Sequence, residues 1–233
     1  MSTPAGGAVE RRVTFSSNSS ECKAYEALPS RPGPGLVLIQ EWWGLVPHIA
    51  AVADRLAEAG FVTIAPDLYH GETTSAPDEA DRMMMQLEMA QAARDLAGAV
   101  SYLLEHPRVV PRKVGVVGFC MGGALSLVLA TVAPIDATVV FYGLPYKGEP
   151  EYANLASPVL GHWAEEDRWW PADEAREVFD RLRALGKDVT LEVYPGTRHG
   201  FFNDELPHAY DPAAAEVAWT RTIGFLRAHL AEA

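Results

Sequence analysis

The stretch KVGVVGFCMGGALSLVLA, residues 113–130, decides the fold. An apolar run, a cluster of glycines and a second apolar run follow one another directly. This order is typical of a buried parallel strand that turns sharply into a helix. Cys120 lies at the turn between Gly118 and Gly122, which is the spacing of a Gly-x-Ser-x-Gly nucleophile motif with cysteine in place of serine. The pattern leaves two interpretations of Cys120: a catalytic nucleophile, or a small buried apolar residue.

Strands and helices are expected to alternate along the whole chain. The expected strands are residues 10–16, 21–27, 35–40, 61–68, 113–119, 137–143, 158–163 and 189–195. The expected helices are residues 47–60, 77–107 (one long helix or two abutting helices), 121–133, 171–186 and 212–231. This alternation predicts an α/β fold, with a mostly parallel central sheet and helices on both faces. In such sheets, ligands bind beyond the carboxyl ends of the strands.

Length and composition favour one α/β domain that spans residues 1–233, because 48% of the residues are hydrophobic and can form a large core. The chain has 19 basic and 31 acidic residues, and its net charge is −12. A chain with this balance has no basic stripe for a phosphate backbone, so no nucleic-acid partner is expected.

The cysteine pattern and the N-terminal residues indicate where in the cell the protein is expected. Cys22 and Cys120 are far apart and form no C-x-x-C pair, so neither a disulfide framework nor a cysteine zinc site is expected. Residues 1–12 lack the apolar segment of a secretory signal, and no apolar run is long enough to span a bilayer. We therefore expect a cytoplasmic protein that binds neither metal nor membrane and keeps its thiols reduced.

A nucleophile elbow at Cys120 would explain the glycines. The turn forces strained backbone angles on the nucleophile, and larger side chains two positions away would clash. The thiol would lie at the N-terminus of the following helix, where the helix dipole favours a thiolate. The backbone N–H of Met121 would then be available to a developing oxyanion.

A thiolate nucleophile also needs a base and an orienting acid. Asp167 and His199 each follow an expected strand, and they come after Cys120 in the order nucleophile, acid, histidine. Glu165 and Glu166 are rival acids. Asp167 could instead cap a helix, and His199 could be a loop residue held by turn hydrogen bonds. Agreement in residue type, order and position favours the catalytic interpretation.

With these features the sequence resembles the dienelactone hydrolase family of α/β-hydrolases over nearly its whole length. The segments that carry the resemblance are QEWWG (40–44), APDLY (65–69), GFCMGG (118–123), DRWWP (167–171) and RHGFFN (198–203). The resemblance implies an α/β-hydrolase fold, no cofactor, and a catalytic triad of Cys120, Asp167 and His199.

The resemblance also implies roles around the nucleophile. Glu41 would interact with the nucleophile or its neighbours at rest, and would accept the thiol proton when substrate displaces it. The backbone N–H groups of Trp42 and Met121 would form the oxyanion hole.

One departure from the family concerns the substrate. Members that cleave dienelactone hold its carboxylate with arginines, one of them shortly after the catalytic histidine. Here Asn203 stands at that position, while Arg82 is a candidate for the other arginine. The remaining residues expected to line an apolar pocket are Trp43, Trp169, Trp170 and Phe201.

The expected function is hydrolysis of activated carboxylic esters or lactones through a thioester. The partner is a small-molecule ester or lactone, and the protein is expected to be a monomer or homodimer. Other activated esters, including phosphotriesters, are an alternative substrate class. A ligand-binding or redox-sensing protein on the same scaffold is the alternative from another functional class.

Overall fold

A computed structural model describes residues 11–17 and 20–231 of the chain. Residues 1–10, on which most of the expectation about a secretory signal rests, lie outside the described residues. Eight strands form one sheet in the order β1-β2-β4-β3-β5-β6-β7-β8. Strand β2 is antiparallel to both of its neighbours, and the other adjacent pairs are parallel. The strands are β1 (Arg11–Ser17), β2 (Ser20–Ala27), β3 (Gly33–Ile39), β4 (Val62–Pro66), β5 (Val109–Phe119), β6 (Ala137–Phe141), β7 (Val159–Ala164) and β8 (Val189–Tyr194).

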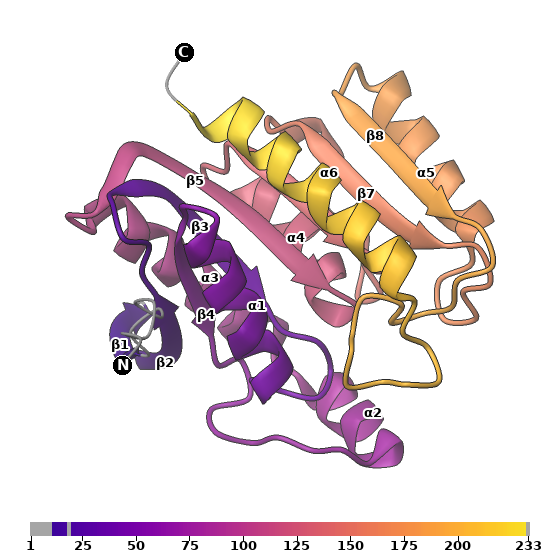
Figure 1. The fold of residues 1–233 in the computed structure, drawn as a ribbon, viewed down its shortest axis with the longest axis horizontal. Helices are drawn as coiled ribbons and strands as arrows, with labels where there is room; N and C mark the ends of the chain where they lie inside the picture. The colour runs from indigo at the N-terminus through magenta and orange to yellow at the C-terminus, as the bar shows by residue number, and fades with distance from the viewer. Residues whose placement is uncertain (1–10, 18–19, 232–233) are drawn as a thin grey trace, which may run out of the picture.

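The helices cover both faces of this sheet. They are α1 (Pro47–Glu58), α2 (Pro77–Gln86), α3 (Met89–Glu105), α4 (Met121–Val132), α5 (Ala172–Ala184) and α6 (Pro212–Leu230), with a short 3₁₀ helix at Tyr152–Asn154. Helices α1 and α6 contribute to one buried apolar cluster, and α3, α4 and α5 contribute to another. Figure 1 shows α6 in front of the sheet and α4 behind it. Among the described residues, no helix has both the length and the apolar character needed to cross a membrane.

The expected order of elements is confirmed throughout the described residues. The segment 77–107 forms two helices, because the backbone leaves helical geometry at Leu87 and Glu88. The 3₁₀ helix at Tyr152–Asn154 was not expected, since three residues carry no readable periodicity. Strands β3 to β8 run parallel, so their carboxyl ends share one edge of the sheet, which is the edge that positions the site.

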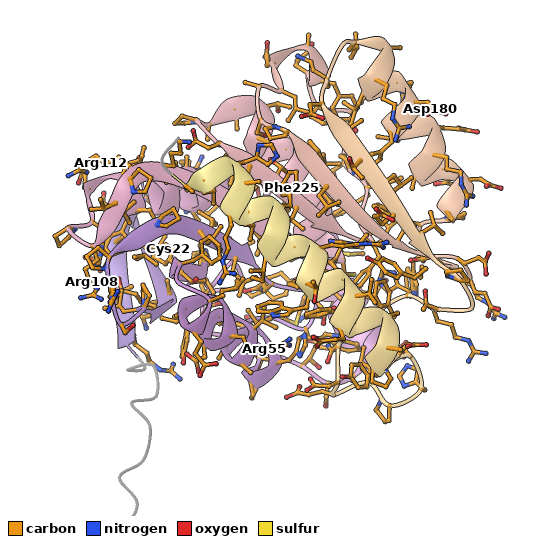
Figure 2. All side chains as sticks on the ribbon, turned by 45° about the horizontal axis from the view of Figure 1, so that its top comes forward. Cys22, Arg55, Arg108, Arg112, Asp180 and Phe225 are labelled. Atoms are coloured by element: carbon orange, nitrogen blue, oxygen red, sulfur yellow. The ribbon has the colours of Figure 1, made fainter. Side chains whose placement is uncertain are left out.

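An interaction between α1 and α6 ties the two helices of one face together. Arg55, a residue of α1, is labelled in Figure 2. Its guanidinium carbon lies 4.2 Å from the centre of the Trp219 ring and 5.5 Å from that of the Phe202 ring. A guanidinium over an aromatic face is attracted by the ring quadrupole. Phe202 belongs to the loop between β8 and α6, so this contact also fixes the loop that carries His199.

His162 on β7 is part of the core. Its ring nitrogens lie 2.8 Å from the Tyr194 hydroxyl and 2.9 Å from Thr222 Oγ1. Burial, helped by the charge of Arg221, lowers the pKa of His162 to about 3. The imidazole is therefore neutral in the folded protein at every ordinary pH, and its two nitrogens are already used.

A His162→Gln variant should be less sensitive to acid than the wild type. In the unfolded chain a histidine takes up a proton near pH 6.5, whereas folded His162 does so only near pH 3. The neutral form thus contributes stability that is complete above pH 6.5 and declines below it by about 1.4 kcal/mol per pH unit. Urea unfolding between pH 8 and pH 4.5 measures this, with the exposed His208→Gln as control. A constant stability difference between wild type and His162→Gln over that range would contradict it.

Candidate active site

Cys120 sits on a strained turn between β5 and α4. Its backbone angles are φ 54° and ψ −118°, and its N–H donates to the Phe141 carbonyl at 3.0 Å. A non-glycine residue in this region is uncommon and persists only where the surroundings enforce it. The expected strain at the nucleophile position is therefore present, and the thiol is placed at the first turn of α4.

Three glycines enforce the turn. A Cβ on Gly118 would lie 2.0 Å from the Gly122 carbonyl oxygen, and one on Gly122 would lie 2.3 Å from the Ile39 carbonyl oxygen. Gly143 was not anticipated from the sequence, because it lies on a different strand end. A Cβ there would lie 1.9 Å from the carbonyl oxygen of Cys120. The turn thus depends on close backbone contacts from β3 and β6 as well as on its own motif.

Asp167 and His199 meet at the carboxyl edge of the sheet. His199 Nδ1 lies 2.8 Å from Asp167 Oδ2. The other carboxylate oxygen, Oδ1, accepts from the backbone N–H groups of Trp169 at 2.8 Å and Trp170 at 3.0 Å. Asp167 is buried and its orientation is fixed, so it can hold the imidazole in a single tautomer.

The two rival acids have other partners. Glu165 accepts from the backbone N–H of Gly196 at 2.8 Å. Glu166 lies 3.6 Å from the Arg198 guanidinium, and both of these side chains are exposed. Asp167 is therefore the carboxylate of this loop that faces His199.

His199 also interacts with the Cys120 side chain. Burial disfavours a charge on the imidazole. The Cys120 charge and the hydrogen bond that the imidazole N–H donates to Asp167 are the main effects that outweigh burial, and they raise the pKa of His199 to about 10. The arrangement therefore favours a protonated imidazole next to Cys120, and a protonated imidazole can give its proton to a leaving group.

Glu41 is buried directly after β3. Its carboxylate accepts from Asn203 Nδ2 at 2.7 Å and from the Tyr142 hydroxyl at 3.4 Å. The Tyr142 ring centre in turn lies 4.9 Å from that of His199. Burial, followed by the charges of Glu41 and Cys120, raises the pKa of Tyr142 well above its usual value. Glu41 thus belongs to the same charge network as the thiol.

Sequence reasoning missed Tyr142. It follows β6 directly and has a φ of 37°, in the left-handed region that residues other than glycine rarely adopt. A tyrosine directly after a buried apolar strand is interpreted as a core residue, and the sequence offers no other indication of a role in the site. Only the folded sheet places its hydroxyl beside Glu41.

The expected aromatic grouping forms around the site. The ring of Trp42 lies 5.0 Å from that of Trp43 and 4.9 Å from that of Trp169, while Trp170 lies 5.7 Å from His199. A hollow of about 350 Å³ is lined in part by Trp169 and His199. A second hollow, of about 590 Å³, is lined in part by Trp43 and Asn203.

Two residues expected in the pocket lie elsewhere. Phe201 is fully buried in the core, with its ring 5.5 Å from Tyr142 and 5.0 Å from Tyr194, because the tight turn after His199 directs it inward. Arg82 is exposed on α2 and pairs with Glu79 one helical turn away. The structure thus places Phe201 in the core rather than in the pocket, and Arg82 on the surface of α2.

The two expected oxyanion donors follow β3 and β5. Met121 is the first residue of α4, so its N–H has no acceptor within the helix. Trp42 lies in a turn that the Gly44 N–H closes onto the Glu41 carbonyl at 3.4 Å. Within residues 11–17 and 20–231, no three histidine, cysteine or acidic side chains converge to hold a metal ion.

This sheet order, with a strained glycine-flanked turn after β5, is that of an α/β-hydrolase. Residues 22–230 match the sequence model of the dienelactone hydrolase family, and the chain belongs to that family.

Individual relatives align with this chain over nearly their full lengths. The chain is 37% identical to "Protein usf" of Aquifex pyrophilus and 33% identical to a putative carboxymethylenebutenolidase of Aquifex aeolicus. Each alignment covers 94% of this chain and 98% of the relative. The solved structure of a dienelactone hydrolase-like promiscuous phosphotriesterase from metagenomic libraries superimposes with a TM-score of 0.87 at 26% identity. That alignment covers 96% of this chain and 99% of the other.

Substituting Gly143 should damage the turn at Cys120 from outside its own motif. We expect Gly143→Ala to lower the free energy of unfolding by about 3 kcal/mol, because the backbone at Cys120 cannot move away without breaking its contact with β6. Gly224→Ala on α6 is the matched control, since a Cβ there meets nothing within 4 Å. It should raise stability by about 0.5–1 kcal/mol. Urea unfolding measures both, and equal effects would contradict the prediction.

Proposed function

We propose that this protein hydrolyses activated carboxylic esters or lactones without a cofactor, through a triad of Cys120, His199 and Asp167 and a thioester intermediate. The observation that carries the proposal is the position of His199. Its imidazole is hydrogen-bonded to Asp167 and interacts with the side chain of Cys120, which lies at a strained strand-to-helix turn. This is the arrangement of nucleophile, base and orienting acid that acyl transfer requires.

In the first half of the reaction the Cys120 thiolate attacks the carbonyl carbon, and the carbonyl electron pair moves onto oxygen. The N–H groups of Met121 and Trp42 would stabilise that oxyanion. Collapse of the tetrahedral species breaks the bond to the leaving oxygen. The His199 imidazolium gives this oxygen its proton, so an alcohol leaves, or the opened ring of a lactone stays attached as the acyl group.

In the second half, neutral His199 takes a proton from water, and the hydroxide attacks the thioester. The carbon–sulfur bond breaks, the acid forms, Cys120 leaves as a thiolate, and His199 is again an imidazolium. Asp167 keeps the imidazole oriented throughout, because its Oδ1 is held by two backbone N–H groups while Oδ2 faces His199. Atoms and charge balance over the cycle, with water as the only co-substrate.

The chemistry of the thiolate restricts the substrate. A thiolate is itself a good leaving group, so a poor alkoxide would be expelled less readily than the thiol. Enol lactones and aryl esters should therefore be preferred. Asn203 carries an amide in place of a guanidinium, and this amide is bound to Glu41. The Arg82 guanidinium is paired with Glu79. Neither residue therefore offers a free guanidinium to a substrate carboxylate. We therefore propose uncharged acyl groups rather than dienelactone itself.

Activated phosphotriesters are a second candidate substrate class. The structural relative with a TM-score of 0.87 is described as a promiscuous phosphotriesterase, and it shares the fold over almost its whole chain. The same thiolate could attack phosphorus and release an aryloxide protonated by His199, leaving an S-phosphoryl enzyme for water to cleave.

A redox-sensing role has less support. Cys22 and Cys120 are both free thiols. Burial, with the nearby Asp95 charge, raises the pKa of Cys22 to about 12. A thiol that stays protonated at neutral pH is a poor partner for resolving an oxidised Cys120.

Cys120→Ala should abolish ester turnover. We expect kcat/KM for a 4-nitrophenyl ester to fall at least about a thousandfold, because no other group can form the acyl-enzyme. Cys22→Ala is the matched control and should retain activity within about twofold. Mass spectrometry of acid-quenched wild type should show one acyl group on Cys120. Turnover by folded Cys120→Ala at the wild-type rate would exclude the proposed nucleophile.

Glu41→Gln tests whether Glu41 accepts the thiol proton. If it does, the rate of Cys120 alkylation by iodoacetamide near pH 7 should fall by about tenfold, since the thiol loses its acceptor. If Glu41 acted only through its negative charge, Glu41→Gln would instead raise the alkylation rate, because removal of a neighbouring negative charge favours the thiolate. Glu165→Gln, also after a strand end, is the control. An unchanged or faster rate in Glu41→Gln would contradict the acceptor role.

A further inference from the structure

The hollow of about 350 Å³ beside His199 carries charge that the proposed mechanism does not use. Besides His199 and Trp169, the residues that line it include Arg168, Arg198, Glu166 and His208. Two guanidinium groups therefore share the hollow with one carboxylate. The net charge of the whole chain is −12, so the charge at this hollow is opposite in sign to that of the protein as a whole.

Arg168 supplies the excess positive charge. The other guanidinium of the hollow, that of Arg198, lies 3.6 Å from the Glu166 carboxylate. Arg168 is exposed, and its guanidinium makes no ion pair or hydrogen bond with any residue of 11–17 and 20–231. A guanidinium presents five N–H donors in a planar fork that fits a carboxylate. Arg168 thus offers a free carboxylate-binding group in the same hollow as the proposed base.

The hollow lies next to the atoms that take part in the proposed reaction. Trp169, one of its lining residues, has its ring centre 4.9 Å from that of Trp42 and 6.5 Å from that of His199. Trp42 is one of the two proposed oxyanion donors. His199 Nδ1 faces the buried Asp167, so the accessible part of the imidazole lies away from the acid. A group bound in this hollow is therefore adjacent to the imidazole that protonates the leaving oxygen.

The part of the substrate that fits this hollow is the leaving group. Its oxygen receives a proton from His199, so it must lie within hydrogen-bond distance of the imidazole. The acyl group is instead bonded to Cys120, which does not line the hollow. The Trp169 side chain is 53% exposed and offers a ring face on which an aromatic leaving group can stack.

We propose that this hollow is a leaving-group subsite, in which Arg168 binds a carboxylate carried by the phenol whose oxygen His199 protonates. The inference rests on the proposed function, and it adds the chemical class of the leaving group: an anionic aromatic alcohol. The acyl group remains uncharged, as argued above from Asn203 and Arg82. Attraction between exposed charges is modest and is screened by salt, so the selectivity is several-fold rather than many orders of magnitude.

The test compares 2-nitrophenyl butyrate with 3-butanoyloxy-4-nitrobenzoate, which differ only in a carboxylate on the leaving phenol. The readout is kcat/KM for the benzoate divided by kcat/KM for the neutral ester, relative to wild type, which cancels the intrinsic reactivities. We expect this ratio to fall about fivefold in Arg168→Gln and more than about tenfold in Arg168→Glu. A structural effect on the neighbouring Asp167 would lower both values together and leave the ratio unchanged.

Two further variants and a salt series complete the experiment. Glu166→Gln removes the carboxylate of the hollow and releases Arg198, so it should raise the ratio about twofold. Arg183→Gln removes the same charge from an exposed arginine in the last turn of α5, paired with Asp180, and should leave the ratio unchanged. Raising NaCl from about 0.05 M to about 0.5 M should reduce the difference between wild type and Arg168→Gln, because salt screens exposed charges.

The outcomes separate this inference from the proposed function. A third ester, 2-nitrophenyl hydrogen succinate, carries its carboxylate on the acyl group, and an equal loss on this ester in Arg168→Gln would overturn the leaving-group assignment. Turnover of the neutral ester, with an unchanged benzoate ratio in both Arg168 variants, would overturn the role of Arg168 alone. Failure of the wild type to turn over any of the three esters would overturn the proposed function and this inference with it.

Discussion

The site depends on the backbone conformation of Cys120. A φ of 54° at a cysteine is unfavourable, and it persists because the strand, the helix and the neighbouring strands enclose the turn. Gly118, Gly122 and Gly143 let three backbone segments approach closer than any Cβ would allow. This close approach holds the thiol at the start of α4 and above the carboxyl edge of the sheet. The partners of Cys120 are arranged around that fixed point.

The second constraint is the cost of buried charge. Ionisable groups that are removed from water are retained only when each is paired. Asp167 meets two backbone N–H groups and His199, while His199 meets Asp167 and Cys120. Glu41 meets Asn203. The amide of Asn203 thus satisfies a buried carboxylate at the position where the family resemblance leads one to expect an arginine for the substrate.

The fold and the three proposed catalytic residues could be predicted from the sequence because both leave local signals. A buried parallel strand is a short apolar run, and a polar residue just after it belongs to the ligand-binding edge of the sheet. Cys120, Asp167 and His199 all carry that signal. Phe201 misled the sequence analysis because adjacency to His199 does not specify which way a side chain points. Arg82 misled it because a helical position does not reveal which face is solvated.

The sequence by itself determined the alternation of strands and helices, the glycine-flanked turn and the order of nucleophile, acid and histidine. These features are written in spacing and residue type, which act over a few residues. The tertiary structure alone decided which side chains share the charge network. Tyr142 follows an ordinary apolar strand, and Gly143 is 23 positions from Cys120. Their roles arise from packing between distant strand ends, which no local pattern encodes.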